Sequence, residues 1–344
     1  MHHAVGSALI NIQARRDSGK RELIDQVINV AFGIDDGYAV HCAVAMASLL
    51  DFIHEKQRIR IFILNSDLSP ANQHGISDLF SSFAGLEIVY VHVDAEYFKS
   101  FSHKTSYIST ATYFRLKLQA LLPTDVEKVL YIDSDLVVVD NIVGLWKEDI
   151  GDNYIGGILD AQGRSHAGRL GFKPGQPYIN AGVSAFNLKK IRAIDVDALY
   201  RETHDRHFDK ITLQDQDIIN IAFADAVAPL PTRWNAQAPL YNPAGYYASD
   251  DHVERDQTAV ENPAIVHFTG KSKPWQAACT HPLRSIYLHY RKKIGWKLLP
   301  GQYYKTALFS MVPEGDMVII HVCFLRIVLH KKYIRWLYDL LKRG

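Results

Sequence analysis

Short apolar runs alternate with longer amphipathic stretches through residue 159 of the chain. Runs this short suit strands that are buried on both faces, whereas the longer stretches suit helices packed on a sheet. This alternation predicts an α/β fold with a mostly parallel sheet. The expected strands are Val27–Phe32, Ile59–Leu64, Leu86–Val93, Val129–Ile132 and Tyr154–Leu159, and the expected helices are Tyr38–Ile53, Pro70–Phe83 and Thr112–Leu122.

From residue 178 onward the pattern is more mixed. We expect a strand pair or strand edge, a helix with a polar start, a last short strand and a basic amphipathic helix. These four segments are Tyr178–Leu188, Gln214–Phe223, Ala264–Phe268 and His281–Ile294. The chain therefore divides into a polar, irregular leader over 1–26, an α/β body over 27–279 and a basic helical extension over 280–344.

The composition is that of a soluble globular protein, with 344 residues, 48% hydrophobic and 22% charged. Cys42, Cys279 and Cys323 are widely spaced and odd in number. They form neither a disulfide framework nor a zinc-like spacing, which favours a reducing cytoplasm. The first residues lack the basic and apolar regions of a signal peptide.

Charge is distributed unevenly along the chain. Residues 284–344 carry 12 Lys and Arg against 3 Asp and Glu, a balance of +9. Since the whole chain has a net charge of +1, residues 1–283 carry −8. A basic tail on an acidic body indicates an anionic partner. Because nucleic-acid-binding motifs are absent from the sequence, we expect a membrane surface and no nucleic acid.

Two carboxylates, Asp133 and Asp135, follow directly on an apolar strand. Residues i and i+2 of a strand point to the same side, so both carboxylates are expected to aim at one spot. Buried charges are costly unless they are paired or bind a metal, and oxygen ligands suit a divalent cation. The alternative is a strand end with two solvated acids before a turn. The same spacing recurs at Asp195/Asp197 and Asp215/Asp217, but not after an apolar strand.

Five segments occur in an order and spacing that are similar to those of one enzyme family. They are AFGIDDGY at 31–38, TYFRL at 112–116, LYIDSD at 130–135, NAG at 180–182 with QDQD at 214–217, and HFTGKSKPW at 267–275. Across about residues 27–275 the chain thus resembles the family 8 glycosyltransferases, a retaining group. The resemblance implies a GT-A nucleotide-binding sheet over 27–279 and UDP-glucose or UDP-galactose as the donor.

The resemblance assigns Asp133, Asp135 and His267 to a bound Mn²⁺ or Mg²⁺. Two carboxylates with an imidazole suit manganese better than magnesium, which prefers oxygen ligands and water. The metal would neutralise the leaving UDP. Lys273 would place positive charge on the phosphates, and Gly270 would let the backbone approach them.

The other implied roles concern the nucleotide and the sugar. Asp35 would accept from the uracil N–H, Tyr38 would stack on the ring, and Arg115 would reach the phosphate or the donor sugar. Further nucleotide contacts are implied for Gly33, Ile34, Asp36, Gly37, Ser134, Asn180 and Ala181. Asn180 would also line the donor-sugar pocket, together with the expected catalytic residues Asp160, Asp215 and Gln216, of which Asp215 and Gln216 lie nearest the anomeric carbon.

Several alternatives stay open. His267 could be a core histidine, Tyr38 could simply pack at a helix start, and Lys273 could be a solvated loop residue. The family often has Asn where Gly37 stands, which would alter a ribose contact. Retention could proceed by double displacement on Asp215 or Gln216, or by same-face attack assisted by the leaving phosphate.

The C-terminal region has a different character. An apolar stretch at 317–329 is too short to span a bilayer. From Lys331 the basic residues fall on one helical face and the apolar residues on the other, which is the pattern of an interfacial helix on an anionic membrane. A helix packed on the catalytic domain is the alternative.

The C-terminal region is also similar to the extension of lipopolysaccharide-core family members. This similarity implies a lipopolysaccharide core as the acceptor. It also implies that residues 317–344 hold the protein peripherally on the inner membrane, at its cytoplasmic face. The acceptor could instead be another glycan or a protein, and a non-catalytic nucleotide-sugar-binding protein is the alternative of a different class.

Overall fold

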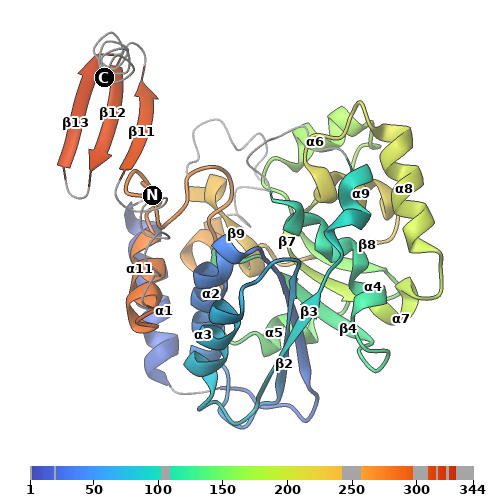
Figure 1. Ribbon diagram of the computed structural model, residues 1–344, viewed down its shortest axis with the longest axis horizontal. Coiled ribbons are helices and arrows are strands. Elements are labelled where there is room, and N and C mark those ends of the chain that lie inside the picture. The colour runs from blue at the N-terminus through green and yellow to red at the C-terminus, as the bar shows by residue number, and fades with distance from the viewer. Residues whose placement is uncertain are drawn as a thin grey trace.

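A seven-stranded sheet in the order β3-β2-β1-β4-β7-β6-β8 forms the centre of the computed structural model (Figure 1). The structure describes residues 2–18, 21–101, 109–241 and 257–296, and the backbone of strands at 309–314, 317–322 and 325–330. Strands β1 to β4 are mutually parallel, as the alternation predicted. The strands are β1 (Ile28–Gly33), β2 (Ile59–Asn65), β3 (Leu86–His92), β4 (Lys128–Ile132), β6 (Ile155–Leu159), β7 (Ile179–Asn187) and β8 (Val227–Leu230).

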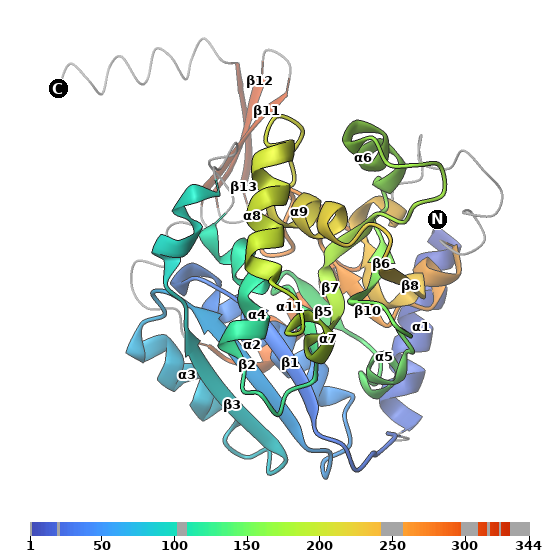
Figure 2. The ribbon, with the colours of Figure 1, turned by 90° about the vertical axis from the view of Figure 1, so that its right-hand side faces the viewer.

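Alternate residues of each central strand enter two separate cores. On β1, Val30 and Phe32 pack toward the almost fully buried helix α2 (Ala39–Asp51), while Ala31 points to the other core. Figure 2 shows helices α8 (Val196–His207) and α9 (Gln214–Ala222) on that other face. Burial on both faces explains why these strands are continuous apolar runs.

The direction of β7 determines where the polar residues meet. It runs antiparallel to both β4 and β6, so its first residues lie beside the ends of those two strands. The Asp133 N–H after β4 donates to Gly182 O at 2.8 Å, and the Asp160 N–H after β6 donates to Tyr178 O at 2.9 Å. Three chain segments therefore converge at one edge of the sheet.

A second, three-stranded sheet completes that edge. It consists of β5 (Leu136–Val138), β10 (Ile265–His267) and β9 (Ala236–Gln237). Because β5 pairs antiparallel with β10, His267 lies opposite Leu136, one residue beyond Asp135. The turn that carries both aspartates thus connects the two sheets.

The helices follow the expected positions with small shifts of their ends. The segment Thr112–Leu122, expected as one helix, is instead a 3₁₀ helix η3 (Thr110–Lys117) followed by α4 (Leu118–Leu121). Further helices are α3 (Pro70–Phe80), α5 (Val143–Lys147), α6 (Gly163–Leu170), α7 (Leu188–Ile191), α11 (Arg284–Lys293) and the short 3₁₀ helices η1 (Asp36–Tyr38), η2 (Ala95–Ser100), η4 (Thr232–Asn235) and η5 (Ala238–Tyr241).

The expectation of an irregular leader was wrong for most of its length. Residues His2–Ser18 form helix α1, in which Ala8 and Ile12 are buried. Arg15 fixes the helix to the body, since it donates to Val139 O at 2.7 Å and to Pro263 O at 2.8 Å. These buried contacts, rather than a regular apolar stripe, hold the helix in place.

The expectation of a helical C-terminal extension holds only for its first part, α11. Residues 309–330 contain three antiparallel strands, β11 (Phe309–Glu314), β12 (Met317–Val322) and β13 (Leu325–His330). The interfacial helix expected from Lys331 onward lies outside the described residues. Among the helices that the structure describes, none has the length and apolar character needed to cross a bilayer.

Candidate active site

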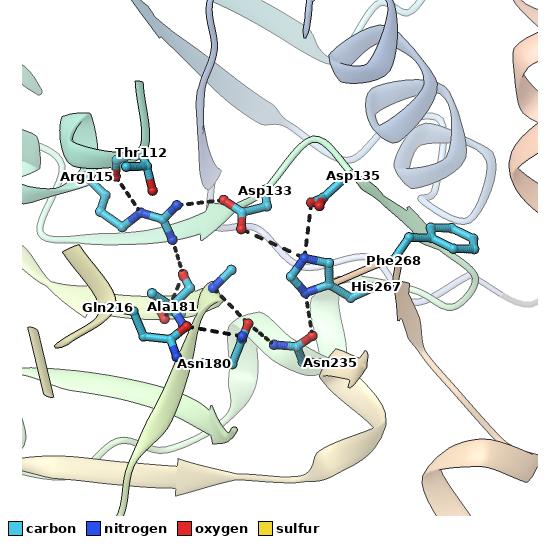
Figure 3. A network of polar contacts seen from close by, with 12 residues as sticks. Thr112, Arg115, Asp133, Asp135, Asn180, Ala181, Gln216, Asn235, His267 and Phe268 are labelled. Atoms are coloured by element: carbon cyan, nitrogen blue, oxygen red, sulfur yellow. Dashed lines mark hydrogen bonds and ion pairs between the residues drawn. The ribbon is translucent and has the colours of Figure 1, made fainter. Parts of the chain in front are cut away.

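Asp133, Asp135 and His267 come together as the sequence predicted (Figure 3). One possible ligand atom from each residue lies within 4.8 Å of the others. His267 Nε2 is 3.1 Å from Asp135 Oδ1 and 3.8 Å from Asp133 Oδ2. Two carboxylates and one imidazole form a donor set that suits a divalent transition metal, so these residues fit a bound cation.

Gly182 makes room for this cluster. A Cβ atom at this position would lie 2.3 Å from His267 Cε1 and 2.6 Å from Asp133 Oδ2. Both distances are shorter than non-bonded atoms tolerate, so a larger residue would displace two of the three candidate ligands. The sequence identified the Asn-Ala-Gly segment, but not this steric role of its glycine.

Arg115 neutralises the cluster from inside the protein. Its side chain is 4% exposed and donates to Asp133 Oδ1 at 2.7 Å, while its Nε lies 2.9 Å from Asp215 Oδ2. The guanidinium also donates to Ala181 O and lies over the Tyr131 ring, 4.1 Å from its centroid. Arg115 is thus within the site, with its guanidinium engaged by protein groups.

Asp215 is itself nearly inaccessible, at 3% exposure. One carboxylate oxygen accepts from the Thr112 hydroxyl at 2.5 Å and the other pairs with Arg115. Burial raises the pKa of Asp215 to about 6, although Arg115 opposes that shift. The preceding residue, Gln214, has a left-handed backbone with φ of 43°, a conformation that costs energy outside glycine.

Lys273 provides a second positive charge, which pairs with Asp135. Its Nζ contacts Asp135 Oδ2 and donates to Phe268 O at 2.9 Å. Burial alone would raise the pKa of Asp135, but Lys273 and His267 hold that pKa below its usual range. Asp135 is therefore ionised at neutral pH. The turn before Lys273 requires Gly270, whose φ is 81°.

The segment expected to read the base lies next to the cluster. Asp35 caps η1, since its Oδ1 accepts from the Tyr38 N–H at 3.1 Å. Burial and the charges of Asp135 and Asp35 raise the pKa of Tyr38. The Tyr38 ring packs edge-on against Trp275, with centroids 5.8 Å apart.

Three of the expected sugar-pocket residues hydrogen-bond to one another. Asn180 Nδ2 donates to Asp160 Oδ2 at 3.0 Å, and Gln216 Nε2 donates to the same oxygen at 3.2 Å. Gln216 Oε1 accepts from the Ala181 N–H at 3.1 Å. Asp160, Asn180 and Gln216 thus form one group, whereas Asp215 pairs with Arg115.

Other expected nucleotide residues have structural contacts. Ile34 is 1% exposed and Ser134 is 4% exposed, so their side chains belong to the core. Asp36 Oδ1 accepts from the Ser69 N–H at 2.8 Å and from Asn72 Nδ2 at 2.7 Å, which fixes the start of α3. Gly33 ends β1, and Gly37 is exposed within η1.

Asn235 is a site residue that sequence reasoning missed. It is fully buried at the end of η4, and its Oδ1 lies 2.9 Å from His267 Nδ1. A polar residue inside the otherwise apolar run from Trp234 to Ala236 was the available signal, but asparagine is too common in turns to identify a role.

A sheet whose strand ends carry this cluster is the arrangement of a GT-A glycosyltransferase. The family model described as glycosyl transferase family 8 matches residues 29–279, and the chain belongs to this family. The expectations of a family 8 enzyme and of a GT-A fold are thereby confirmed.

Solved structures and curated proteins similar to this chain include two named as galactosyltransferases and one named as a stress protein. The solved structure of the galactosyltransferase LgtC with donor and acceptor sugar analogues has a TM-score of 0.71 and 30% identity, covering 80% of this chain and 99% of that one. General stress protein A of Bacillus subtilis is 26% identical over 80% of this chain and 96% of its own length. Lipopolysaccharide 1,3-galactosyltransferase of Salmonella typhimurium is 24% identical over 78% of this chain and 79% of its own length.

Proposed function

We propose that the protein is a metal-dependent retaining hexosyltransferase that moves glucose or galactose from a UDP-sugar to a lipopolysaccharide core. The observation that carries this proposal is the contact between two groups of residues. The N–H of Asp133, a residue of the candidate metal cluster, donates to Gly182 O, and Gly182 is the last residue of the sugar-pocket segment that begins at Asn180. Donor diphosphate and donor sugar can therefore be held at adjacent positions.

In this proposal Asp133, Asp135 and His267 hold Mn²⁺ or Mg²⁺, with the imidazole favouring manganese. The bound metal would supply Lewis-acid neutralisation of the diphosphate. When the donor binds, the Lys273 ammonium group would exchange its ion pair with Asp135 for one with a phosphate oxygen. Asp35 would accept from the base with the carboxylate oxygen that does not cap η1, and Tyr38 would stack on the ring.

The contacts of Asp215 and Gln216 bear on the mechanism. Both oxygens of Asp215 have partners, and the side chain is 3% exposed. Gln216 Oε1 already accepts from the Ala181 N–H and from Asn180 Nδ2. The carboxylate oxygens of Asp215 and the amide oxygen of Gln216 are therefore already occupied by hydrogen-bond or ion-pair partners and are not free to act as a nucleophile. This favours same-face attack over double displacement. Asp160 and Gln216 would then contact sugar hydroxyls, and Asp215 would act by holding Arg115.

The acceptor part of the proposal rests on the names of relatives. A lipopolysaccharide 1,3-galactosyltransferase and a lipopolysaccharide 1,2-glucosyltransferase of Escherichia coli match 78% and 82% of this chain. The basic segment at 284–344, with 12 Lys and Arg against 3 Asp and Glu, would attract the enzyme to anionic lipid at the cytoplasmic face of the inner membrane. A different glycan or protein acceptor is the second candidate, since the match over 96% of the length of general stress protein A is to a protein whose name indicates no lipopolysaccharide.

The direct test measures release of UDP from UDP-glucose and UDP-galactose with Mn²⁺, with and without purified lipopolysaccharide core. We expect release with one donor, stimulation by the core, and loss of both in Asp133→Ala. Release that the core does not stimulate would favour the second candidate. No release with any donor or acceptor would favour a nucleotide-sugar-binding protein. Mass spectrometry of the core from a deletion strain would then name the sugar and its position.

A further inference from the structure

A series of amide groups connects the metal ligand His267 with the expected sugar pocket (Figure 3). Asn235 is the amide next to His267. Its Oδ1 lies 2.9 Å from His267 Nδ1, and its Nδ2 donates to Asn180 Oδ1 at 2.9 Å. Asn235 lies in η4, whereas His267 is in β10 and Asn180 is in β7, so Asn235 connects two strands from a third element.

The orientation of the Asn180 amide is determined by its other partners. Asn180 Oδ1 is 3.1 Å from the backbone N–H of Gly182, a group that can only donate. Asn180 Nδ2 is 3.0 Å from Asp160 Oδ2 and 3.2 Å from Gln216 Oε1, an atom that must be an oxygen because it also faces the Ala181 N–H. If the amide were reversed, its NH₂ group would face the Gly182 N–H and its oxygen would face Asp160 Oδ2, so both hydrogen bonds would be lost. The atom that Asn180 presents to Asn235 must be its oxygen.

The orientation of Asn180 determines that of Asn235, which in turn determines which nitrogen of the His267 imidazole is protonated. The Asn235 atom that faces Asn180 Oδ1 must be the nitrogen, so the carboxamide oxygen faces His267. An oxygen acceptor at 2.9 Å requires that His267 Nδ1 carry a proton. Nε2 is then the ring nitrogen directed at Asp133 and Asp135, at 3.8 Å and 3.1 Å. A metal-binding histidine is usually held by such a partner on its other nitrogen.

We infer that Asn235 is a positioning residue that fixes two parts of the site with one amide. Through its oxygen it orients His267 so that Nε2 is directed at the metal position. Through its nitrogen it orients Asn180 toward Asp160 in the sugar pocket. The first half depends only on contacts within the chain, whereas the second half rests on the proposed function.

Two substitutions separate the two halves. Asn235→Asp keeps an oxygen acceptor for His267 Nδ1 but loses the donor to Asn180. Asn235→Ala loses both. We expect a downfield, slowly exchanging imidazole proton of His267 in the NMR spectrum of the metal-free protein, assigned with His267→Gln. This signal should persist in Asn235→Asp and disappear in Asn235→Ala.

Titration with Mn²⁺ alone gives the second readout. We expect Asn235→Ala to weaken Mn²⁺ binding about 10- to 100-fold, the usual effect of losing such a partner. Asn235→Asp should bind Mn²⁺ at least as tightly as wild type. For the sugar half, Asn235→Asp should lower the kcat of UDP-sugar hydrolysis at least about tenfold while KM for Mn²⁺ stays the same.

A buried asparagine outside the site provides the control. Asn65 is 5% exposed, and its Nδ2 donates to Ile63 O at 3.1 Å. Asn65→Asp makes the same chemical change and should leave the His267 proton and the Mn²⁺ affinity at wild-type values. If Asn65→Asp also lost the His267 proton signal or bound Mn²⁺ more weakly, the effects in the Asn235 variants would be due to general destabilisation, and the inference would be overturned.

The outcomes also distinguish this inference from the proposed function. Retention of the His267 proton in Asn235→Ala, or equal loss of Mn²⁺ affinity in both variants, would overturn the metal half. A wild-type kcat in Asn235→Asp would overturn the sugar half. If the unmodified enzyme hydrolyses no UDP-sugar, the proposed function and the sugar half fail together, whereas the proton and Mn²⁺ readouts still decide the metal half.

Discussion

Arg115 donates a hydrogen bond to Asp133 at 2.7 Å, so a buried cation holds one of the three candidate metal ligands from inside the protein. The Arg115 side chain is 4% exposed, and its Nε pairs with Asp215 at 2.9 Å. A single guanidinium therefore orients a candidate metal ligand, Asp133, and compensates the buried carboxylate of Asp215. Only the planar, forked guanidinium can serve several acceptors in this way.

Removal of that guanidinium should destabilise the fold and not only the site. Arg115→Met leaves the buried Asp215 and the partly exposed Asp133 without their common counter-charge, and an uncompensated buried carboxylate typically costs about 3–5 kcal/mol. Arg115→Lys keeps the charge but has all its N–H donors on a single nitrogen, which cannot reach the partners of both Nε and Nη, so we expect a loss of about 1–2 kcal/mol. Urea unfolding at neutral pH measures both. A loss below about 1 kcal/mol in Arg115→Met would show that the pair is not structurally important.

Gly182→Ala tests how closely β7 approaches the candidate metal cluster. The added Cβ would lie 2.3 Å from His267 Cε1 and 2.6 Å from Asp133 Oδ2, so both ligands must move. We expect Mn²⁺ affinity to fall at least about tenfold, since ligand geometry determines metal affinity. Calorimetric titration with Mn²⁺ measures this change.

Gly168→Ala is the matched control for that substitution. Gly168 lies within α6, and a Cβ there meets no atom within 4 Å. Because alanine is the better helix former, this variant should be more stable by about 0.5–1 kcal/mol, with unchanged Mn²⁺ affinity. Equal Mn²⁺ affinities for the two variants would show that the cluster tolerates a side chain at 182.

The sequence was sufficient to predict the parallel half of the sheet. Strands such as β1 and β2 are apolar runs because both of their faces are buried, and that property is visible locally. The direction of β7 was not predictable, since antiparallel pairing with β4 depends on a partner some 50 residues away. Helix α1 was missed because its attachment rests on a few contacts, such as those of Arg15, rather than on apolar periodicity.

The site was predictable where a residue type limits the chemistry. Asp133 and Asp135 after an apolar strand indicated a cation, and the resemblance added His267, which the structure places beside them. Asn235 was not predictable, because its role follows from hydrogen-bond polarity among residues distant in sequence. Arg115 was recognised by resemblance, but its pairing with Asp215 became visible only in three dimensions.

Lys273→Gln should change metal and nucleotide binding in opposite directions. In the structure Lys273 pairs with Asp135, one of the candidate ligands, so it competes with a cation for that carboxylate. Without this competition, Mn²⁺ alone should bind about 3- to 10-fold more tightly. UDP with Mn²⁺ should bind about 10- to 100-fold more weakly, because a charge-assisted contact to phosphate is lost.

Calorimetry with Mn²⁺ alone and then with UDP separates the two effects of Lys273→Gln. Lys292→Gln, which removes the same charge from an exposed position on α11, should change neither affinity by more than about twofold. If both affinities fall together in Lys273→Gln, Lys273 supports the cluster rather than competing for it.

His41 should make the stability of the protein depend on pH in the mildly acidic range. Its imidazole stacks on Trp275 with ring centroids 3.6 Å apart and hydrogen-bonds the Tyr287 hydroxyl at 2.6 Å. Burial lowers the pKa of His41 to about 3, with a further contribution from Arg291. The unfolded chain, in contrast, binds a proton at this side chain near pH 6.5.

The sign of the effect follows from these two pKa values. Between about pH 3 and 6.5 the unfolded state binds more protons at His41 than the folded state does, so the free energy of unfolding rises with pH. Between pH 5 and 6.5 this group alone should add about 1.5–2 kcal/mol. His41→Phe keeps a ring against Trp275 but does not titrate. Between pH 5 and 6.5 its free energy of unfolding should therefore rise by about 1.5–2 kcal/mol less than that of the wild type.

Urea unfolding at several pH values measures how the free energy of unfolding depends on pH. His74→Gln, at a side chain that is 79% exposed, is the control and should retain the wild-type pH dependence. Equal slopes for wild type and His41→Phe would mean that the folded protein accommodates a protonated His41.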